Sequence, residues 1–369
     1  MTFTPPPYPY ERLDGVRELA SRHDGGAIDC SIGTPIDPPP DFVIEELARA
    51  AGARGYPTSA GSLDYREAAA SWLRRRFGVE AGADNVAACV GTKEFVASLA
   101  QYLTLRDDTR DTVLYPAVSY PTYAMGATLA GLRAVAVPVI GGRLDLAAIE
   151  SDDVARALVL WSNSPSNPTG GLDDLAAVAA WGRGNGVLVA SDECYSDFTW
   201  DGPSRSILEH GEEGVLALHS VSKRSNLAGL RAGFYSGDRN VVAYLRSVRQ
   251  HAGLMVAGPV QAAVALAYGD DEHVEVQRRR YHARLALLSS ALTLAGAEAS
   301  MPQGGFYLWC RVTGLDGWQL ATRLAEVAGL VVSPGELYGD GGDYVRIAVV
   351  QSDERLELAA SRLREGHLR

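Results

Sequence analysis

Apolar positions along the chain follow two alternating patterns. Residues 41–53 and 62–77 carry apolar side chains at intervals of three and four, which predicts two amphipathic helices. From about residue 86 to residue 237, short apolar runs alternate with helical stretches. The seven runs cover residues 86–90, 112–115, 134–137, 157–161, 187–191, 215–219 and 233–236. This alternation predicts an α/β domain with a mostly parallel, seven-stranded sheet flanked by helices on both faces.

The pattern changes after residue 240. It is helical to about residue 295, and candidate strands at 306–310, 330–332 and 344–349 then alternate with helices, which predicts a smaller α+β domain. The first forty residues are rich in Pro and Gly and are predicted to form an irregular arm. We therefore expect an arm with part of the small domain over 1–40, a large cofactor-binding domain over 41–250, and a small domain over 251–369.

The overall charge and the apolar runs exclude several functions. A net charge of -11 over 369 residues argues against a nucleic-acid surface. No uninterrupted apolar run has membrane-spanning length, and the N-terminus lacks the basic and then apolar stretch of a signal peptide, so we expect a cytoplasmic protein. The four cysteines are scattered and show no metal-ligand spacing, so we expect reduced thiols and no metal site.

Lysine is almost absent from this chain. Of its 34 basic residues only Lys93 and Lys223 are lysines. Arginine can replace lysine as a surface charge, but its guanidinium stays protonated and cannot act as a nucleophilic amine. The retained lysines therefore indicate where a reactive amine is needed. For Lys93 alone, chance retention explains the residue equally well, whereas Lys223 has serines on its N-terminal side.

Polar clusters follow four of the predicted strands. They occupy residues 91–94, 163–170, 192–195 and 220–223. Open α/β sheets bind their ligands at the carboxyl ends of the strands. We therefore expect these clusters to form one site.

The groups expected around Lys223 suit a particular kind of cofactor. A lysine amine with a lowered pKa condenses with carbonyl compounds. Hydroxyl groups, a guanidinium and the backbone N–H groups at a helix start all bind phosphate. A cofactor that is both an aldehyde and a phosphate ester would use both features. The expected phosphate ligands are Gly91, Thr92, Lys93, Ser220, Ser222 and Arg231.

Other polar and aromatic residues suit a pyridine ring. Asp192, at a strand end, can pair with a protonated ring nitrogen and so maintain the electron sink that carbanion chemistry requires. Tyr195 and Asn167 can hydrogen-bond a ring hydroxyl, and Tyr120 can stack on the ring face. Each feature alone has a structural alternative: residues 167–170 are a common turn signal, Asp192 could cap a helix, and Tyr120 could be a core aromatic.

The segments NSPSNPTG, SDECY and SVSKRSNLAGLRAG resemble the class I/II aminotransferases of the fold-type I pyridoxal-phosphate superfamily. The resemblance extends over residues 31–347. It implies pyridoxal 5'-phosphate as the cofactor, Lys223 as the Schiff-base lysine and Asp192 as the pyridinium partner. It also implies the following roles: Tyr195 and Asn167 at the ring oxygen, Tyr120 as the stacking aromatic, and Gly91, Thr92, Lys93, Ser220, Ser222 and Arg231 around the phosphate.

The same resemblance implies a shared site and a substrate pocket. Tyr56 matches a tyrosine that reaches the phosphate of the neighbouring subunit, which implies a homodimer. Arg346 matches the arginine that binds the substrate α-carboxylate, and Gly33 and Asn167 match residues that line that pocket. The implied reactants are an amino acid and a 2-keto acid.

A closer similarity is to the actinobacterial N-succinyldiaminopimelate aminotransferases of lysine biosynthesis. It rests on SIGTPIDPPP, GYPTSAG, VGTKE, YPTY, SKRSNLAGLRAGF, RQHAGLMV, GPVQAA and FYLW. It implies amino transfer from glutamate to N-succinyl-2-amino-6-ketopimelate, with Arg224 and Asn226 as candidates for its further carboxylates. The chain departs from this pattern at residues 8–10 (Tyr-Pro-Tyr for Phe-Pro-Trp), at Leu230 (for Tyr) and at residues 334–338 (PGELY for PGDFY). These departures leave another dicarboxylic or aromatic substrate open.

Three other functions are weighed against this interpretation. A carbon–sulfur β-lyase of the same superfamily would use the same lysine and phosphate groups. A non-catalytic pyridoxal-phosphate-binding regulator would carry a DNA-binding module before the aminotransferase-like part, and the family pattern already starts by residue 30. A nicotinamide-dependent dehydrogenase would need GxGxxG after the first strand, and the sequence has none there.

Overall fold

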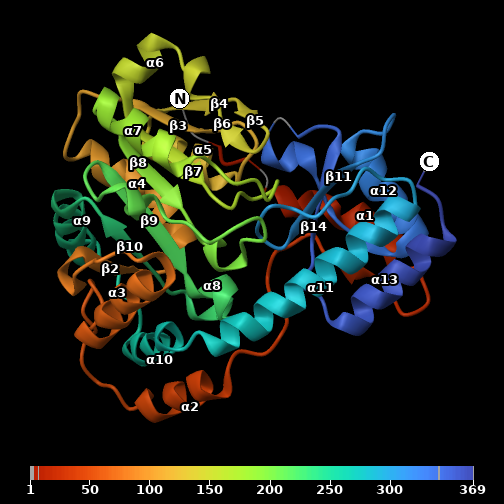
Figure 1. Ribbon diagram of the computed structural model, residues 1–369, viewed down its shortest axis with the longest axis horizontal. Helices are drawn as coiled ribbons and strands as arrows, with labels where there is room; N and C mark the ends of the chain where they lie inside the picture. Colours follow the sequence, from red (N-terminus) through yellow and green to blue (C-terminus); the bar gives the residue numbers. More distant parts are fainter. Residues whose placement is uncertain (1–3, 7, 340, 369) are drawn as a thin grey trace.

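The computed structural model describes residues 4–6, 8–339 and 341–368. Residues 1–3 and 7 of the expected arm, and residues 340 and 369 of the expected small domain, lie outside the described residues. Figure 1 shows two α/β parts side by side, each with its own sheet. Helix α11 (Glu272–Leu294) runs from the larger part along the smaller one. The site described below lies where the two parts meet.

The larger part is built on a seven-stranded sheet with the order β2-β10-β9-β8-β7-β3-β4. Strand β10 is antiparallel to both of its neighbours, and the remaining neighbours pair in parallel. This confirms the predicted mostly parallel sheet. All residues of β7, β9 and β10 are buried, as expected for strands covered on both faces. The strands are β2 (Val86–Cys89), β3 (Thr112–Pro116), β4 (Arg133–Val137), β7 (Ala157–Asn163), β8 (Leu188–Asp192), β9 (Val215–Ser220) and β10 (Gly233–Gly237).

Helices cover both faces of this sheet, and each face has its own core. One core includes Tyr65 and Trp72 of α3 together with apolar residues of α2, α7 and α10. The other includes Phe95 of α4 and Tyr123 of α5 together with residues of α9. The helices are α2 (Asp41–Ala50), α3 (Leu63–Phe77), α4 (Thr92–Thr104), α5 (Thr122–Leu129), α6 (Ser151–Arg156), α7 (Leu175–Asn185), α9 (Arg239–His251) and α10 (Gly258–Gly269).

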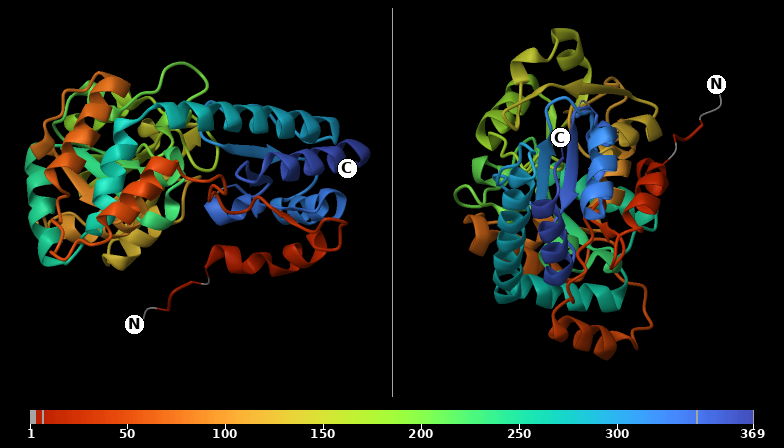
Figure 2. Two further views of the ribbon diagram at one scale, coloured as in Figure 1. Left: turned by 90° about the horizontal axis from the view of Figure 1, so that it is seen from below. Right: turned by 90° about the vertical axis from the view of Figure 1, so that its right-hand side faces the viewer.

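The smaller part combines two short sheets with four helices. Strands β11 (Tyr307–Arg311), β14 (Tyr344–Ala348) and β13 (Ser333–Pro334) form an antiparallel sheet in that order, and β1 (Ile28–Asp29) pairs with β12 (Leu330–Val331). Its helices are α1 (Asp14–Ala20), α11, α12 (Gly317–Ala328) and α13 (Asp353–Glu365). Figure 2 shows α11 extending along this part towards the C-terminus.

The N-terminal region is more regular than its composition predicts. A 3-10 helix over Pro9–Leu13 leads directly into α1, which packs against α12. The prediction of an irregular arm is therefore wrong for residues 9–20. Helix α1 has only seven residues, which is too short to produce a clear apolar period, and it forms because Val16 and Ala20 are buried against Ala325 and Val331.

Helix α10 bears on the division into two domains. It packs against α2 and α3 of the larger part, although the expected boundary at residue 250 would assign it to the smaller domain. The packing favours a boundary near residue 270, where α11 begins. No helix among the described residues is long and apolar enough to span a membrane.

Candidate functional site

Residues from both parts line one cavity of about 380 Å³. It lies at the carboxyl ends of β7, β8 and β9, where the sequence predicted a site. Of the residues expected at the cofactor and the α-carboxylate, only Gly91 and Tyr56 are outside its lining. Those that line it are Gly33, Thr92, Lys93, Tyr120, Asn167, Asp192, Tyr195, Ser220, Ser222, Lys223, Arg231 and Arg346.

The register of the parallel strands brings the polar clusters together. Asn163, the last residue of β7, lies opposite Asp192, the last residue of β8. The Asn163 amide donates a 2.8 Å hydrogen bond to the backbone carbonyl of Asp192. Its side-chain oxygen accepts a 2.7 Å hydrogen bond from the backbone N–H of Asn167. The loop after β7 is thus tied to the end of β8, which fixes Asn167 at the cavity.

Lys223 belongs to a single helical turn, α8 (Val221–Arg224), that follows β9 directly. The turn is capped by Ser220, whose hydroxyl accepts a 3.1 Å hydrogen bond from the backbone N–H of Ser222. The Lys223 amine donates a hydrogen bond to the backbone carbonyl of Gly33. Burial, with Arg346 also acting in the same direction, lowers its pKa to about 8. A substantial share of this amine is therefore neutral near pH 8, unlike a surface lysine.

Asp192 is buried, and each of its two carboxylate oxygens accepts a hydrogen bond. The Tyr123 hydroxyl donates to its Oδ2 at 2.8 Å, and the backbone N–H of Cys194 donates to its Oδ1 at 3.3 Å. Burial raises the pKa of this carboxyl group, and the hydrogen bonds from Cys194 and Tyr123 oppose that shift. A cation placed beside the carboxylate would favour its charged form.

Gly91 contributes to the site although it does not line the cavity. Its φ of +77° is one that favours glycine, and a Cβ atom there would lie 2.2 Å from Nη2 of Arg231. Glycine therefore leaves room for the Arg231 guanidinium. It also precedes α4, so the backbone N–H groups of Thr92 and Lys93 lack acceptors within that helix.

The side chain of Lys93 is directed towards aromatic residues. Its amine donates a 3.1 Å hydrogen bond to the Tyr8 hydroxyl and lies 4.9 Å from the centre of the Tyr8 ring. It lies 5.9 Å from the centre of the Tyr120 ring. Burial opposes a rise in the pKa of Lys93, but the contacts with Tyr120 and Tyr8 outweigh it and raise the pKa, so the amine remains a cation.

Arg346 supplies a second, buried cation. Its side chain comes from β14, with Nη1 donating to Oδ1 of Asn167 at 2.8 Å and Nη2 donating to the backbone carbonyl of Ser31 at 2.5 Å. The guanidinium lies 4.3 Å from the ring centre of Tyr307 and 4.7 Å from that of Tyr338. Its Nε has no hydrogen-bond partner among the described residues.

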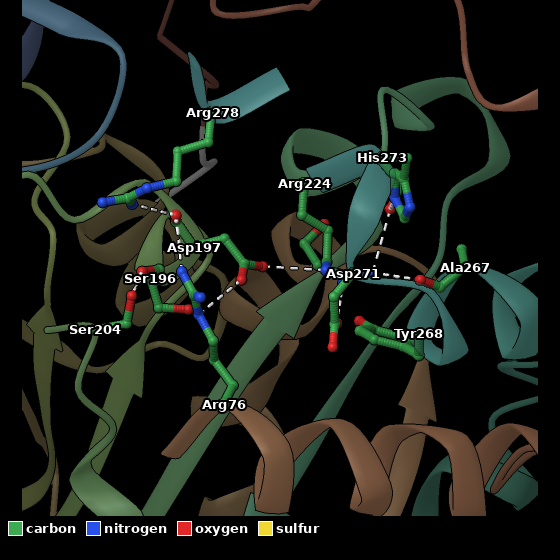
Figure 3. A network of polar contacts seen from close by, with 12 residues as sticks. Arg76, Ser196, Asp197, Ser204, Arg224, Ala267, Tyr268, Asp271, His273 and Arg278 are labelled. Carbon is green, nitrogen blue, oxygen red and sulfur yellow. Dashed lines mark hydrogen bonds and ion pairs between the residues drawn. The ribbon is translucent and has the colours of Figure 1, made fainter. Parts of the chain in front are cut away.

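Arg224 and Asn226 do not face the cavity, so the expectation that they bind the substrate is wrong. Figure 3 shows Arg224 between Asp197 and the end of α10. Its Nε donates to Oδ2 of Asp197 at 3.0 Å and its Nη1 to the carbonyl of Ala267 at 2.7 Å. Asn226 donates instead to Gln277, at 3.2 Å. Neighbouring residues of a helical turn point about 100° apart, so with Lys223 facing the cavity Arg224 faces the core.

Tyr56 lies on the surface, away from the cavity lining. Its side chain is 97% exposed, the largest value among the exposed large apolar residues. Its expected role in a neighbouring subunit stays a prediction.

Several lining residues were not identified as site residues from the sequence. Tyr123 could have been found, because it follows Tyr120 by three residues at a helix start and so lies on the same face. Asn163 could have been found as the first residue of the polar cluster that follows the predicted strand over residues 157–161. Cys194 lies in the polar cluster over residues 192–195 but was not singled out. The other lining residues lie outside the four polar clusters: Tyr8, Tyr10, Ile32, Thr34, Val96, Ala228 and Tyr307.

Comparisons with known proteins agree with this geometry. The family model for aminotransferases of class I and II matches residues 27–363. The 4-dedimethylamino-4-oxo-anhydrotetracycline transaminase OxyQ of Streptomyces rimosus is 41% identical over 367 residues, covering 97% of this chain and 99% of the relative. An LL-diaminopimelate aminotransferase of Desulforudis audaxviator is 36% identical over 376 residues, covering 97% of this chain and 95% of the relative.

A solved structure extends the similarity to the whole fold. A probable N-succinyldiaminopimelate aminotransferase from Thermus thermophilus superimposes with a TM-score of 0.88 at 33% identity, covering 97% of this chain and all of that one. The mostly parallel seven-stranded sheet with its smaller α/β part is the fold-type I arrangement. The chain belongs to the class I and II aminotransferases, a family that depends on pyridoxal phosphate.

Proposed function

We propose that this aminotransferase transfers an amino group between N-succinyl-LL-diaminopimelate and 2-oxoglutarate. The observation that carries the proposal is that the cavity holds two further basic side chains, Arg346 and Lys93, besides Lys223 and Arg231, which are assigned to the cofactor. A substrate with an α-carboxylate and a distant second carboxylate would engage both. The aromatic surroundings of Lys93 suit an extended chain with an amide in it. The names of the relatives from Desulforudis audaxviator and Thermus thermophilus support a diaminopimelate-type substrate.

The donor set of the cavity fits pyridoxal phosphate. A buried amine with a lowered pKa, a buried carboxylate and a group of hydroxyl and guanidinium donors match its aldehyde, its ring nitrogen and its phosphate respectively. When bound, this cofactor supplies an aldehyde that condenses with amines and a ring that withdraws electrons from the substrate Cα.

The proposed roles at the cofactor follow from these positions. Lys223 binds the aldehyde carbon covalently, Asp192 keeps the ring nitrogen protonated, and Tyr120 stacks on the ring. Asn167 and Tyr195 donate hydrogen bonds to the ring oxygen. The phosphate is held by Thr92, by the backbone N–H of Lys93 and by the side chains of Ser220, Ser222 and Arg231. Gly91 leaves room for the Arg231 guanidinium beside it. Tyr56 of the partner subunit also binds the phosphate.

The proposed roles at the substrate concern one proton and one carboxylate. With cofactor and substrate bound, the neutral amine of Lys223 would be the group that takes up the proton of the substrate Cα and releases it on the side of the cofactor. Arg346 binds the α-carboxylate, because its planar fork can form two parallel hydrogen bonds. Asn167 holds the guanidinium through its Oδ1, and the small Gly33 closes that side of the cavity.

A second candidate substrate is a large cyclic ketone. The relative OxyQ supports it, since its name specifies a transaminase for an oxo-anhydrotetracycline. The tyrosines Tyr8, Tyr10 and Tyr120 along the cavity would offer stacking partners for fused rings. In that case the amino donor would still bind Arg346 through its carboxylate.

A comparison of amino donors with 2-oxoglutarate tests the proposal. The measurement is kcat/KM for N-succinyl-LL-diaminopimelate, LL-diaminopimelate, N-acetylornithine, aspartate and aromatic amino acids. The succinylated donor should be the best of the set. A tenfold advantage of any other donor would reject this substrate, while the family membership would stand.

Two further assays cover the other candidates. Glutamate-dependent amination of a 4-oxo-anhydrotetracycline, at a kcat/KM above that of the succinylated pair, would favour the second substrate. Release of pyruvate from cystathionine without any added keto acid would indicate β-lyase chemistry, and we expect none.

A further inference from the structure

Tyr307, the first residue of β11, contacts three parts of the site at once. Its hydroxyl lies 2.9 Å from the hydroxyl of Tyr195. Its ring centre lies 4.3 Å from the guanidinium of Arg346. A Cβ atom on Gly33 would lie only 2.2 Å from the Tyr307 hydroxyl, so only glycine fits against it. The side chain is buried, and these contacts leave it little freedom.

The position of Tyr307 links the two parts of the molecule. Tyr195 follows β8 of the large sheet, whereas Tyr307 and Arg346 come from the adjacent antiparallel strands β11 and β14. Trp309 lies opposite Arg346 in the register, and residues two apart on a strand share a face. Tyr307 and Arg346 therefore project from the same face, and the Tyr307 hydroxyl reaches across to Tyr195.

We propose that Tyr307 is a positioning residue that orients the hydroxyl of Tyr195 and the guanidinium of Arg346 at the same time. The inference rests on the roles proposed above for Tyr195 at the ring oxygen and Arg346 at the α-carboxylate. Tyr307 itself acts through these two residues.

The number of available protons gives the hydrogen bond a direction in the loaded enzyme. The Tyr195 hydroxyl has a single proton, and its oxygen can accept as well as donate. If that proton is donated to the ring oxygen of the cofactor, the Tyr307 hydroxyl becomes the donor to Tyr195. A chain of two such bonds strengthens the second, and this stabilises an anionic ring oxygen. Removing the Tyr307 hydroxyl should therefore make the ring oxygen easier to protonate.

The charged and titratable groups around this pair are few. Arg346 faces both tyrosines, Cys194 faces Tyr195, and Tyr10 and Tyr120 face Tyr307. Burial raises the pKa of Tyr307 to about 12, while Arg346 opposes the shift. Burial also raises the pKa of Tyr195. Both hydroxyls hence keep their protons across the working pH range and act as hydrogen-bond partners.

The first experiment is a pH titration of the absorbance of the enzyme-bound cofactor. Tyr307→Phe keeps the ring and removes only the hydroxyl, and Tyr195→Phe is the reference. Tyr281→Phe is the matched control, because Tyr281 is equally buried and its ring packs against Phe306, outside the cavity lining. For Tyr307→Phe we expect the midpoint to rise by about 0.4–1 pH unit, as for the loss of one neutral hydrogen bond. Tyr281→Phe should titrate like the wild type.

The outcomes separate this inference from the proposals it rests on. A shift in Tyr195→Phe without a shift in Tyr307→Phe overturns the role of the Tyr307 hydroxyl and leaves the assignment of Tyr195 standing. No shift in Tyr195→Phe overturns both. None of these titrations depends on the identity of the amino donor, so a failed succinyldiaminopimelate assay is a separate result.

The second experiment isolates the ring. Tyr307→Leu removes the face that packs on Arg346, so KM for glutamate should rise about tenfold, which corresponds to a desolvated cation–π contact. Tyr307→Phe keeps that face and should leave KM for glutamate unchanged. Equal KM values in the two variants would overturn the role of the ring. Circular dichroism checks the fold, and the phenylalanine variant keeps the hydroxyl part testable if the leucine variant does not fold.

Discussion

Burial of the Lys223 side chain lowers the pKa of its amine, which raises the share of the reactive neutral form. Its pKa, lowered to about 8, makes roughly one amine in ten neutral at pH 7, against far fewer than one in a thousand for an unperturbed lysine. Only the neutral form attacks an aldehyde. The sign of the shift therefore favours cofactor attachment near neutral pH.

This sign can be measured in the cofactor-free protein. The second-order rate of pyridoxal-phosphate attachment, followed by absorbance, should rise with pH, reach half of its plateau near pH 8 and level off about one to two pH units higher, where the amine is fully neutral. Lys223→Arg is the control and should give no covalent attachment, since its guanidinium stays protonated. A rate that keeps rising beyond pH 10 would contradict the lowered pKa.

Lys93 has two possible roles, and one substitution distinguishes them. If its amine binds the distal carboxylate, Lys93→Gln should raise KM for N-succinyl-LL-diaminopimelate by about tenfold, as expected for a lost charge-assisted hydrogen bond. KM for alanine, which lacks a distal carboxylate, is the internal control and should not change. A large loss of affinity for pyridoxal phosphate in this variant would instead place the amine at the phosphate.

At the scale of single residues, prediction from the sequence failed for the directions in which some side chains point. That Lys223 and Asp192 lie at one cavity could be predicted, because the carboxyl ends of neighbouring parallel strands determine their positions. The wrong expectation for Arg224 and Asn226 came from their nearness in sequence to Lys223. Which way each turns depends on contacts with α10 and α11, which are far away along the chain.

At the scale of elements, a network of polar contacts holds α8 against its neighbours. The Asp197 carboxylate forms ion pairs with Nε of Arg76 in α3, at 3.1 Å, and with Nε of Arg224 in α8, at 3.0 Å. Its backbone carbonyl accepts a 2.8 Å hydrogen bond from Arg278 of α11 (Figure 3). Asp197 and Arg224 are both buried, and their pair is the shorter of the two ion pairs of Arg224, the other being with Asp271 at 3.6 Å.

Breaking this pair should destabilise the fold strongly. Asp197→Ala leaves the buried guanidinium of Arg224 with only the half-exposed carboxylate of Asp271, 3.6 Å away, and we expect the free energy of unfolding in urea to fall by about 3 kcal/mol. Arg205→Ala is the control. It breaks the ion pair between Arg205, which is 63% exposed, and Glu209, and should lower the free energy of unfolding by less than about 1 kcal/mol. Similar losses in the two variants would show that the buried pair does not hold α8.

The elements themselves could be predicted where a pattern was long enough. Seven apolar runs matched the seven strands of the large sheet. Inner strands such as β7 and β9 are covered on both faces, whereas the edge strand β4 is largely exposed. The helix over residues 14–20 could not be predicted from its seven residues, since it depends on contacts with α12. Packing of α10 on α2 and α3 was equally hidden, because it joins segments about two hundred residues apart.

At the scale of the whole molecule, exposed Tyr56 supports a dimer with shared sites. The side chain is 97% exposed in the single chain, although the family pattern gives it a function at a phosphate. We expect sedimentation to show a dimer, the commonest closed oligomer. An active monomer at assay concentration would contradict this expectation.

Complementation tests the sharing directly. Tyr56→Ala and Lys223→Ala should each give a deficient homodimer. In the mixed dimer, the site with an intact Lys223 should receive Tyr56 from the partner subunit that carries Lys223→Ala, so part of the activity should return on mixing. Activity that never exceeds the sum of the two separate variants would mean that Tyr56 does not act across the interface.

The distribution of lysine gives this protein an uncommon chemical surface. The side-chain amines of this chain are those of Lys93 and Lys223, and both lie in the cavity. The α-amino group is its other primary amine. Reagents that acylate lysine side chains would therefore react inside the cavity and not on the outer surface. With pyridoxal phosphate attached, mass spectrometry after treatment with an N-hydroxysuccinimide ester should show Lys223 unlabelled. A solid support that couples through lysine could hold this enzyme only by entering its catalytic centre, so immobilisation would have to use another functional group.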